Sequence, residues 1–131
     1  MIRIFKSEYQ GAECYANMGK YFASLDIAKE LDRQLYNKPN SVWYISTYRN
    51  VILGFAALFD NRKYYFIDNL YVRPEHRNEG VAKELIQEIV SDYSDKPIKC
   101  IANNPYALKI FHNLGFTEDG SNGKYKKLTK H

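Results

Sequence analysis

A strand, a glycine-containing turn and a helix follow one another between residues 64 and 93, and this stretch most constrains how the chain can fold. Residues 64–72 alternate as in a β-strand, with Asp68, Leu70 and Val72 expected on one side. Pro74 ends the strand because it has no N–H for a sheet ladder. A helix begins near Gly80, because apolar residues then recur at helical period. They are Val81, Ala82, Leu85, Ile86, Ile89, Val90 and Tyr93.

The turn between this strand and this helix spans residues 77–82, with the sequence RNEGVA. The first N–H groups of a helix lack intrahelical partners, and the helix dipole adds partial positive charge there. Gly80 lets a ligand approach the backbone, Ala82 keeps its position small, and Arg77 supplies a cation. Such a turn suits a pyrophosphate. From these residues alone, the alternative is an ordinary strand-to-helix turn in which the glycine serves only the backbone.

Two motifs in the C-terminal half resemble those of the GCN5-related N-acetyltransferases. Residues 72–86, VRPEHRNEGVAKELI, are similar to the acetyl-CoA-binding motif of that family. In the family, a hydrophobic strand end is followed after about four residues by (Q/R)-x-x-G-x-(G/A). Residues 104–116, NPYALKIFHNLGF, resemble the second conserved block, N-x-x-A-x-x-x-Y-x-x-x-G-F. The N-terminal half fits the family in length and pattern but carries no diagnostic residues.

The resemblance implies that an acetyl group passes directly from acetyl-CoA to an amine, with no covalent enzyme intermediate. It places the pantetheine arm on the main chain at the end of the strand and the pyrophosphate on the amides of the turn. The N–H of Val72 would polarise the thioester carbonyl in an oxyanion-hole role. The implied cofactor-binding residues are Leu70, Tyr71, Val72, Arg77, Asn78, Glu79, Gly80, Val81, Ala82, Asn104 and Phe111.

Acetyl transfer to an amine requires a base that deprotonates the amine and an acid that protonates the departing thiolate. An alkylammonium with a pKa of about 10 must lose a proton before it can attack, and Asp68 is the candidate base, directly or through water. A surface or hydrogen-bonded aspartate is the alternative. Phe111 stands where the family usually has a tyrosine that protonates the departing thiolate, so water, Tyr106 or Tyr71 would have to replace that acid. This substitution leaves a second interpretation open, a non-catalytic CoA-binding sensor or regulatory module of the same fold.

The length of 131 residues predicts a single domain, residues 1–131. A mean hydropathy of −0.53 and a charged content of 26% indicate neither disorder nor a membrane protein. The longest apolar run, residues 51–59, is too short to span a bilayer. The N-terminal residues lack the apolar region of a signal peptide, so we expect a cytoplasmic protein that does not bind membranes.

Cysteine, histidine and lysine usage excludes further classes of function. Cys14 and Cys100 cannot form a disulfide framework, no Cys/His spacing resembles a metal site, and Cys100 is expected to be an inert core thiol. The net charge is only +4, although lysines crowd the C-terminus as a possible basic tail for nucleic acid or an acidic partner. No RNA-recognition motif is present, so nucleic-acid binding is disfavoured. We expect a monomer or homodimer whose acceptor is a small-molecule or protein amine.

The remaining pattern predicts an α/β fold: a mixed, mostly antiparallel sheet with helices on both faces. Two helical pieces are expected within residues 8–35, and Tyr21 and Phe22 at their junction are candidates for the acceptor side. The last helix should begin at Pro105, with Asn104 as its N-cap, and end at Gly115. The resemblance implies that the strands at 64–72 and 98–103 run parallel and splay apart. Strands are expected at 2–6, 41–49, 51–59, 64–72, 98–103 and 124–129, with a turn at 121–123.

Overall fold

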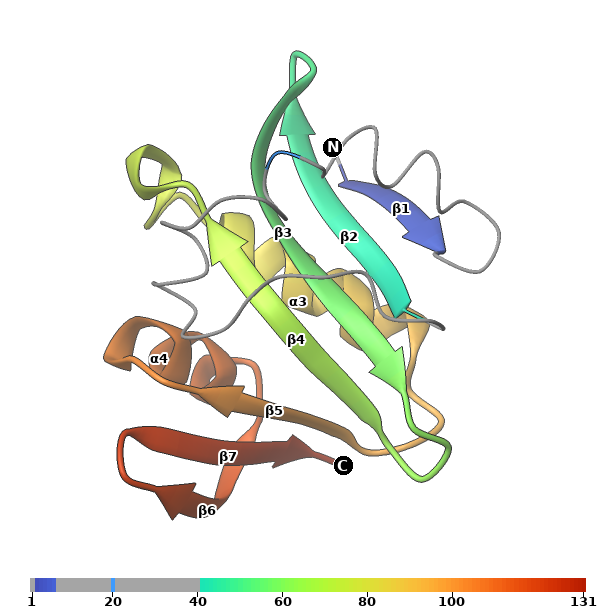
Figure 1. The fold of residues 1–131 in the computed structure, drawn as a ribbon, viewed down its shortest axis with the longest axis vertical. Helices are drawn as coiled ribbons and strands as arrows, with labels where there is room; N and C mark the ends of the chain where they lie inside the picture. Colours follow the sequence, from blue (N-terminus) through green and yellow to red (C-terminus); the bar gives the residue numbers. More distant parts are fainter. Residues whose placement is uncertain (1, 7–19, 21–40) are drawn as a thin grey trace.

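The computed structural model describes residues 2–6, 20 and 41–131. Within these residues a seven-stranded sheet has the order β1-β2-β3-β4-β5-β7-β6, and only β4 and β5 are parallel (Figure 1). The strands are β1 (Ile2–Lys6), β2 (Ser41–Tyr48), β3 (Val51–Asp60), β4 (Tyr65–Val72), β5 (Ile98–Ala102), β6 (Thr117–Asn122) and β7 (Tyr125–Lys130). The helical segments are a short 3-10 helix η1 (Pro74–His76), α3 (Val81–Asp92) and α4 (Pro105–Asn113). The predicted mixed, mostly antiparallel α/β fold is confirmed.

Strand β3 is covered on both faces, as its continuous apolar sequence predicts. Residues 54–58 are buried one after another. Ala56 and Leu58 belong to a core cluster shared with α3, whereas Phe55 and Ala57 belong to a second cluster with Trp43. Because alternate residues of a strand face opposite sides, two cores require an uninterrupted apolar run.

Helix α3 packs on the first of these faces through Leu85, Ile86 and Ile89, which have no exposed surface. Each such side chain contributes roughly 1.5–3 kcal/mol by leaving water, so this stripe anchors the start of the helix beside the sheet. Helix α4 adds Phe111 to the same cluster. The helices predicted within residues 8–35, with Tyr21 and Phe22, lie outside the described residues, so the expectation of helices on the second face is not decided.

Helix α4 begins and ends as its sequence predicts. The side chain of Asn104 accepts a hydrogen bond from the Ala107 N–H at 2.8 Å, and proline follows this N-cap. At the other end Gly115 has a φ of 92°, and its N–H donates to the His112 carbonyl. The Phe116 N–H then donates to the Phe111 carbonyl at 3.0 Å, which completes a Schellman motif.

Strand β4 contains a β-bulge that its sequence does not reveal. Asp68 pairs with Ala57, and Tyr71 pairs with Phe55, so β4 has one more residue between these pairs than β3 has. Asn69 lies in the bulge with a φ of 56°, a left-handed conformation that asparagine adopts more readily than most residues.

The bulge reverses the side on which the following residues lie. Leu70 and Val72 pack with the first core, beside α3. Asp68 stands opposite Ala57, which belongs to the second core, and Tyr71 packs against that same core. The prediction that Asp68 shares a side with Leu70 and Val72 is therefore wrong, because simple alternation does not allow for an inserted residue.

The parallel pair β4–β5 is short and then separates. The two strands pair only from Tyr65 with Ile98 to Ile67 with Cys100. Beyond that point β4 continues to Val72 and β5 to Ala102, and Figure 1 shows the two strands diverging. The expected splay is confirmed, and it creates a wedge between their C-terminal ends.

The C-terminal hairpin differs from the prediction. Residues 117–122 form strand β6, although all of them are exposed and polar or glycine, and the turn lies at residues 123–124 instead of 121–123. Strand β7 lies between β5 and β6, with Leu128 and Thr129 buried. The C-terminal lysines are therefore part of a sheet strand and its turn rather than a solvated tail.

Candidate functional site

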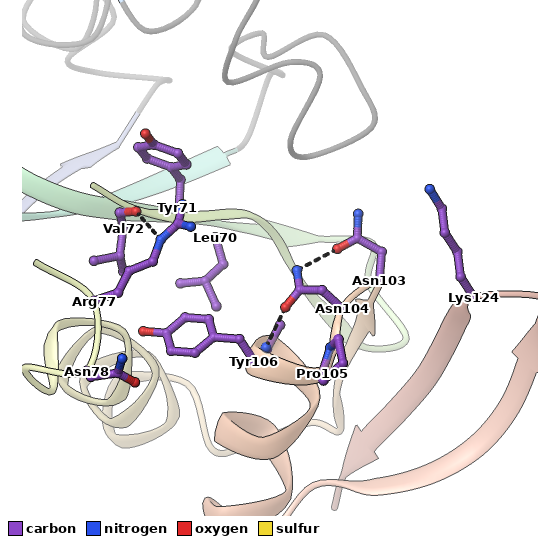
Figure 2. A pocket seen from close by; sticks show the side chains of 11 residues that line it. Leu70, Tyr71, Val72, Arg77, Asn78, Asn103, Asn104, Pro105, Tyr106 and Lys124 are labelled. Carbon is purple, nitrogen blue, oxygen red and sulfur yellow. Dashed lines mark hydrogen bonds between the residues drawn. The ribbon is translucent and has the colours of Figure 1, made fainter. Parts of the chain in front are cut away.

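A cavity of about 470 Å³ lies where β4 and β5 separate (Figure 2). Three parts of the chain form it: the end of β4 with the loop that follows, the start of α4, and the β6–β7 turn. The lining residues are Leu70, Tyr71, Val72, Arg77, Asn78, Asn103, Asn104, Pro105, Tyr106, Ala107 and Lys124. A volume of this size is typical of small-molecule sites, so the wedge can hold a ligand.

The N-terminus of α3, next to this cavity, is suited to an anion. Gly80 is the N-cap with a φ of 85°, and no side chain in the described ranges 2–6, 20 and 41–131 caps the helix. The first intrahelical bond runs from the Glu84 N–H to the Gly80 carbonyl, so the preceding amides have no helical acceptor. A Cβ placed on Gly80 would meet nothing within 4 Å among the described residues. Open space above uncapped amides and the positive end of a helix dipole favour a phosphate group.

Arg77 joins the loop to the end of β4. Its Nε donates to the Val72 carbonyl at 2.9 Å, and its guanidinium lies 5.7 Å from the centre of the Tyr71 ring. These contacts hold a cation at the cavity wall. The acidic groups of the loop bind their own neighbours: Glu79 contacts His76 Nδ1 at 3.0 Å.

The N–H of Val72 is directed toward the wedge. The Arg73 N–H donates to the Leu53 carbonyl at 2.9 Å, and Gly54 pairs with Val72. In an antiparallel pair, successive residues alternate between bonding the neighbour strand and pointing away from it. Val72 therefore turns its N–H away from β3 and toward the side on which β5 has already separated.

The bulge at Asn69 is what produces this orientation. Before the bulge it is the odd-numbered residues of β4 that face β5, as shown by the Tyr65 N–H, which donates to the Pro97 carbonyl at 2.9 Å. After the inserted residue the even-numbered Val72 faces that side. Without the bulge, the Val72 N–H would be used in the ladder with β3.

The opposite wall comes from α4 and the β6–β7 turn. Asn104, besides capping α4, donates from Nδ2 to Asn103 Oδ1 at 3.0 Å. The ring of Tyr106 extends from α4 across the cavity beside Leu70, and Lys124 lies at the far end (Figure 2). The site thus has a cation in each of two distant walls.

The structure brings together most of the residues predicted to bind a cofactor. Residues 79–82 continue from the lining into the loop and the first turn of α3, where Val81 and Ala82 are buried in the core. Phe111 does not line the cavity: it is 2% exposed, and its ring meets that of Phe116 at 5.1 Å. Predicted residues that line the cavity are Leu70, Tyr71, Val72, Arg77, Asn78 and Asn104.

Asp68 also lies outside the cavity lining. It is 7% exposed, and its Oδ1 accepts a hydrogen bond from the Asn69 N–H at 2.9 Å. It lies on the face of the sheet opposite α3, one residue from the lining residues of β4.

Sequence reasoning did not find the cavity residues Asn103, Pro105, Ala107 and Lys124 as ligand contacts. Pro105 was recognised only as a helix-start signal, and a start signal for α4 also marks the wall that α4 supplies. Lys124 comes from a turn that reaches the site through the pairing of β7 with β5. No local pattern could have placed it there.

Other reactive groups do not compete with this site. Burial raises the pKa of the Cys100 thiol well above its usual range, so the expected inert core thiol is consistent with its surroundings. Among the described residues, no group of three or more His, Cys, Asp or Glu side chains could hold a metal ion. None of the helices in the described part of the chain is both long and apolar enough to cross a bilayer.

Comparison with known proteins identifies a family. The sequence model of the acetyltransferase (GNAT) domain matches residues 6–130, nearly the whole chain. No curated protein sequence matches.

Solved structures share the fold over the whole chain. Escherichia coli ElaA superposes with a TM-score of 0.76 at 14% identity, covering 100% of this chain and 99% of its own. An acyl-CoA N-acyltransferase from Pseudomonas aeruginosa gives 0.74 at 11% identity, covering 100% and 99%. A Bacillus anthracis protein, provisionally assigned as a streptothricin acetyltransferase and solved with acetyl coenzyme A, gives 0.62 at 27% identity, covering 72% and 64%.

Proposed function

The chain belongs to the GNAT acetyltransferase family, and from that membership we propose that it transfers an acetyl group from acetyl-CoA directly to a primary amine. One observation carries the proposal. Arg77 and Asn78 line a ligand-sized cavity just before the uncapped N-terminus of α3, and the cavity continues along an edge of β4 that has lost its partner strand. CoA has the matching shape, with a pyrophosphate at one end of a long arm and a thiol at the other.

The residues of the site fit this co-substrate. The amides of residues 78–82 and the guanidinium of Arg77 would hold the pyrophosphate, since charge-assisted hydrogen bonds to phosphate are among the strongest in proteins. The open space above Gly80 leaves room for it. Asn104 has one Nδ2 hydrogen beyond the bond to Asn103, which it could donate to the pantetheine arm.

The two ends of CoA cannot both lie beside Arg77, because the whole pantetheine arm separates them. Val72 is bonded to Arg77 through its carbonyl and so lies near the phosphate end. We therefore assign the Val72 N–H to the pantetheine arm. The oxyanion role expected of it passes to the N–H of Leu70, two residues nearer the point where β4 and β5 part.

Asp68 would act as the base for an amine that reaches the wedge from the second face of the sheet. Its position opposite α3 keeps its negative charge on the other side of the sheet from the helix that would bind the phosphates. A carboxylate there can take the ammonium proton directly or through water. The hydrogen bond from the Asn69 N–H to Oδ1 orients the carboxylate of Asp68.

When bound, acetyl-CoA supplies a thioester. The amine nitrogen forms a bond to the carbonyl carbon, the carbon–sulfur bond breaks, and CoA departs as a thiolate that must take up a proton. Phe111 has no proton to give and is buried away from the cavity. A thiol pKa of about 8.5 makes the thiolate a tolerable leaving group, so water is the proposed proton donor.

The acceptor is either a small-molecule amine or a protein amine. Streptothricin belongs in the first group to be tried, because the B. anthracis protein that carries its name is 27% identical to this chain over the aligned part. A cytoplasmic location, as expected from the sequence, would supply the protein with acetyl-CoA.

The test measures thiol release from acetyl-CoA with streptothricin, spermidine, a lysine-containing peptide and a peptide with a free N-terminus. We expect amine-dependent thiol release and an acceptor heavier by one acetyl group in mass spectrometry. Asp68→Asn should lower the rate constant by about 10²-fold or more without changing CoA affinity. Absence of thiol release with every amine, despite CoA binding, would overturn the catalytic proposal.

A CoA-binding sensor or regulatory module of the same fold is the second candidate. Phe111 favours it, because the residue carries no hydroxyl and lies in the core. The same assay separates the two: a sensor binds CoA tightly and releases no thiol with any amine.

A further inference from the structure

Tyr106 is the one tyrosine in the wall that α4 contributes to the cavity (Figure 2). It follows Pro105 in the first turn of α4. Its ring extends beside Leu70, and its hydroxyl points toward the end of the cavity where Arg77 and Asn78 lie, away from Lys124.

The hydroxyl of Tyr106 makes no hydrogen bond in the part of the chain that the structure describes. Tyr106 is half-buried in the cavity wall, so its hydroxyl is accessible to a ligand in the cavity. The hydroxyl points toward the Arg77 guanidinium and the Asn78 side chain, and the uncapped amides at the start of α3 follow directly after Asn78. A guanidinium and backbone amides can only donate, and a phenol can donate as well, so an anion placed between them would accept hydrogen bonds from all of them together.

We propose that Tyr106 binds the pyrophosphate of CoA through its hydroxyl and is not the acid that protonates the thiolate. The inference rests on the proposed function, which supplies CoA as the ligand. A phosphate oxygen accepts the phenolic hydrogen while Arg77 and the α3 amides bind the other oxygens. The sulfur, at the far end of the pantetheine arm, is out of reach of this hydroxyl.

The alternative acid role is also unfavourable for Tyr71. Its ring packs on Phe55 in the second core, with centroids 5.4 Å apart. The two tyrosines that could have replaced the missing hydroxyl at Phe111 thus have other positions: Tyr71 lines the cavity with its ring held against the second core, and Tyr106 lies at the phosphate end.

Tyr106→Phe tests the proposal because it removes one oxygen and nothing else. We expect the dissociation constant for CoA, measured by isothermal titration calorimetry, to rise about tenfold, as for one hydrogen bond to a charged group. The melting temperature of the protein without ligand should stay the same, because no hydrogen bond of the folded state is lost. Tyr48→Phe, at an exposed hairpin tip, is the control and should bind CoA like the wild type.

Two fragments of the ligand locate the contact. Dephospho-CoA keeps the pyrophosphate but lacks the 3′-phosphate, and Tyr106→Phe should weaken its binding by the same factor as for CoA. Pantetheine lacks the pyrophosphate and the 3′-phosphoadenosine, and the variant should bind it as the wild type does.

Three results would overturn the proposal: unchanged CoA affinity of Tyr106→Phe, a loss that disappears with dephospho-CoA, or an equal loss with pantetheine. Failure of the wild-type protein to bind CoA is a different result, and it would overturn the proposed function together with this inference.

Discussion

Replacing Phe111 with tyrosine asks whether the site lacks only its usual acid. Phe111 is 2% exposed, and its ring lies edge to face against Phe116. A hydroxyl added to this ring therefore enters the core instead of the cavity. A buried hydroxyl without a partner costs about 1–3 kcal/mol, so we expect Phe111→Tyr to lower the free energy of unfolding by about 2 kcal/mol.

For a chain of this length, such a loss corresponds to a fall in melting temperature of roughly 5–10 °C. Thermal and urea unfolding of both proteins measure it directly. Phe111→Leu is the matched control, because it disturbs the packing on Phe116 without adding a polar group. Thiol release from acetyl-CoA, measured with each protein, should be no faster with tyrosine than with phenylalanine.

A faster Phe111→Tyr enzyme of unchanged stability would refute this reasoning. That result would mean that position 111 reaches the sulfur when CoA is bound, and that the site is arranged for a tyrosine acid.

Two further predictions test the wedge and the loop, and a third tests an ion pair between the end of β3 and the segment before β5. Asn69→Val places a β-branched residue at a φ of 56°, which costs about 1–2 kcal/mol of stability and disturbs the bulge. Calorimetry should therefore show weaker CoA binding by Asn69→Val, whereas Asn69→Gly should keep the wild-type affinity. Arg77→Lys keeps the charge but loses the bond from Nε to the Val72 carbonyl, so CoA affinity should fall about fivefold or more, and an unchanged value would show that charge alone matters. The hydrogen bond from the Lys96 ammonium lowers the pKa of Asp60 from 3.8. The pair therefore stabilises the folded protein fully above pH 3.8. This stabilisation is lost as the pH falls through the lowered pKa that Asp60 has in the folded state. Because the pair is largely exposed, Asp60→Asn should lower the free energy of unfolding, measured with urea, by well under about 1 kcal/mol at pH 7 and by less at pH 3. A loss of stability that is larger at pH 3 than at pH 7 would contradict this pH dependence.

Much of the fold could be predicted because its signals are local. The stripe of α3, the N-cap Asn104 and the left-handed Gly115 each depend on neighbours within a few residues, and each lies where the sequence indicated. The continuous apolar run of β3 likewise reports burial on both faces.

The failures come from features that such signals do not carry. The bulge at Asn69 inserts one residue into an alternating strand, and a period of two contains no mark for an insertion. Strand β6 is exposed along its whole length, so no apolar alternation distinguishes it from a loop.

Part of the site could be predicted because its residues are neighbours in the sequence. The turn at residues 77–82 and the end of β4 are adjacent in sequence, and their joint motif indicated the phosphate end. Lys124 and the true surroundings of Phe111 depend on how distant strands and helices pack, which the motif does not describe.

Calorimetric titration of CoA tests the central claim most directly, with wild type, Gly80→Glu and Gly80→Ala side by side. Both variants place a Cβ at a φ of 85°, in space where it meets nothing within 4 Å, so they share the same backbone strain. Only glutamate adds a negative charge and fills the proposed phosphate position. We expect one CoA site per chain in the wild type, retained binding in Gly80→Ala, and none in Gly80→Glu with an unchanged circular dichroism spectrum. Absence of a binding heat for the wild type at millimolar CoA, or equal affinity in Gly80→Glu, would contradict the account.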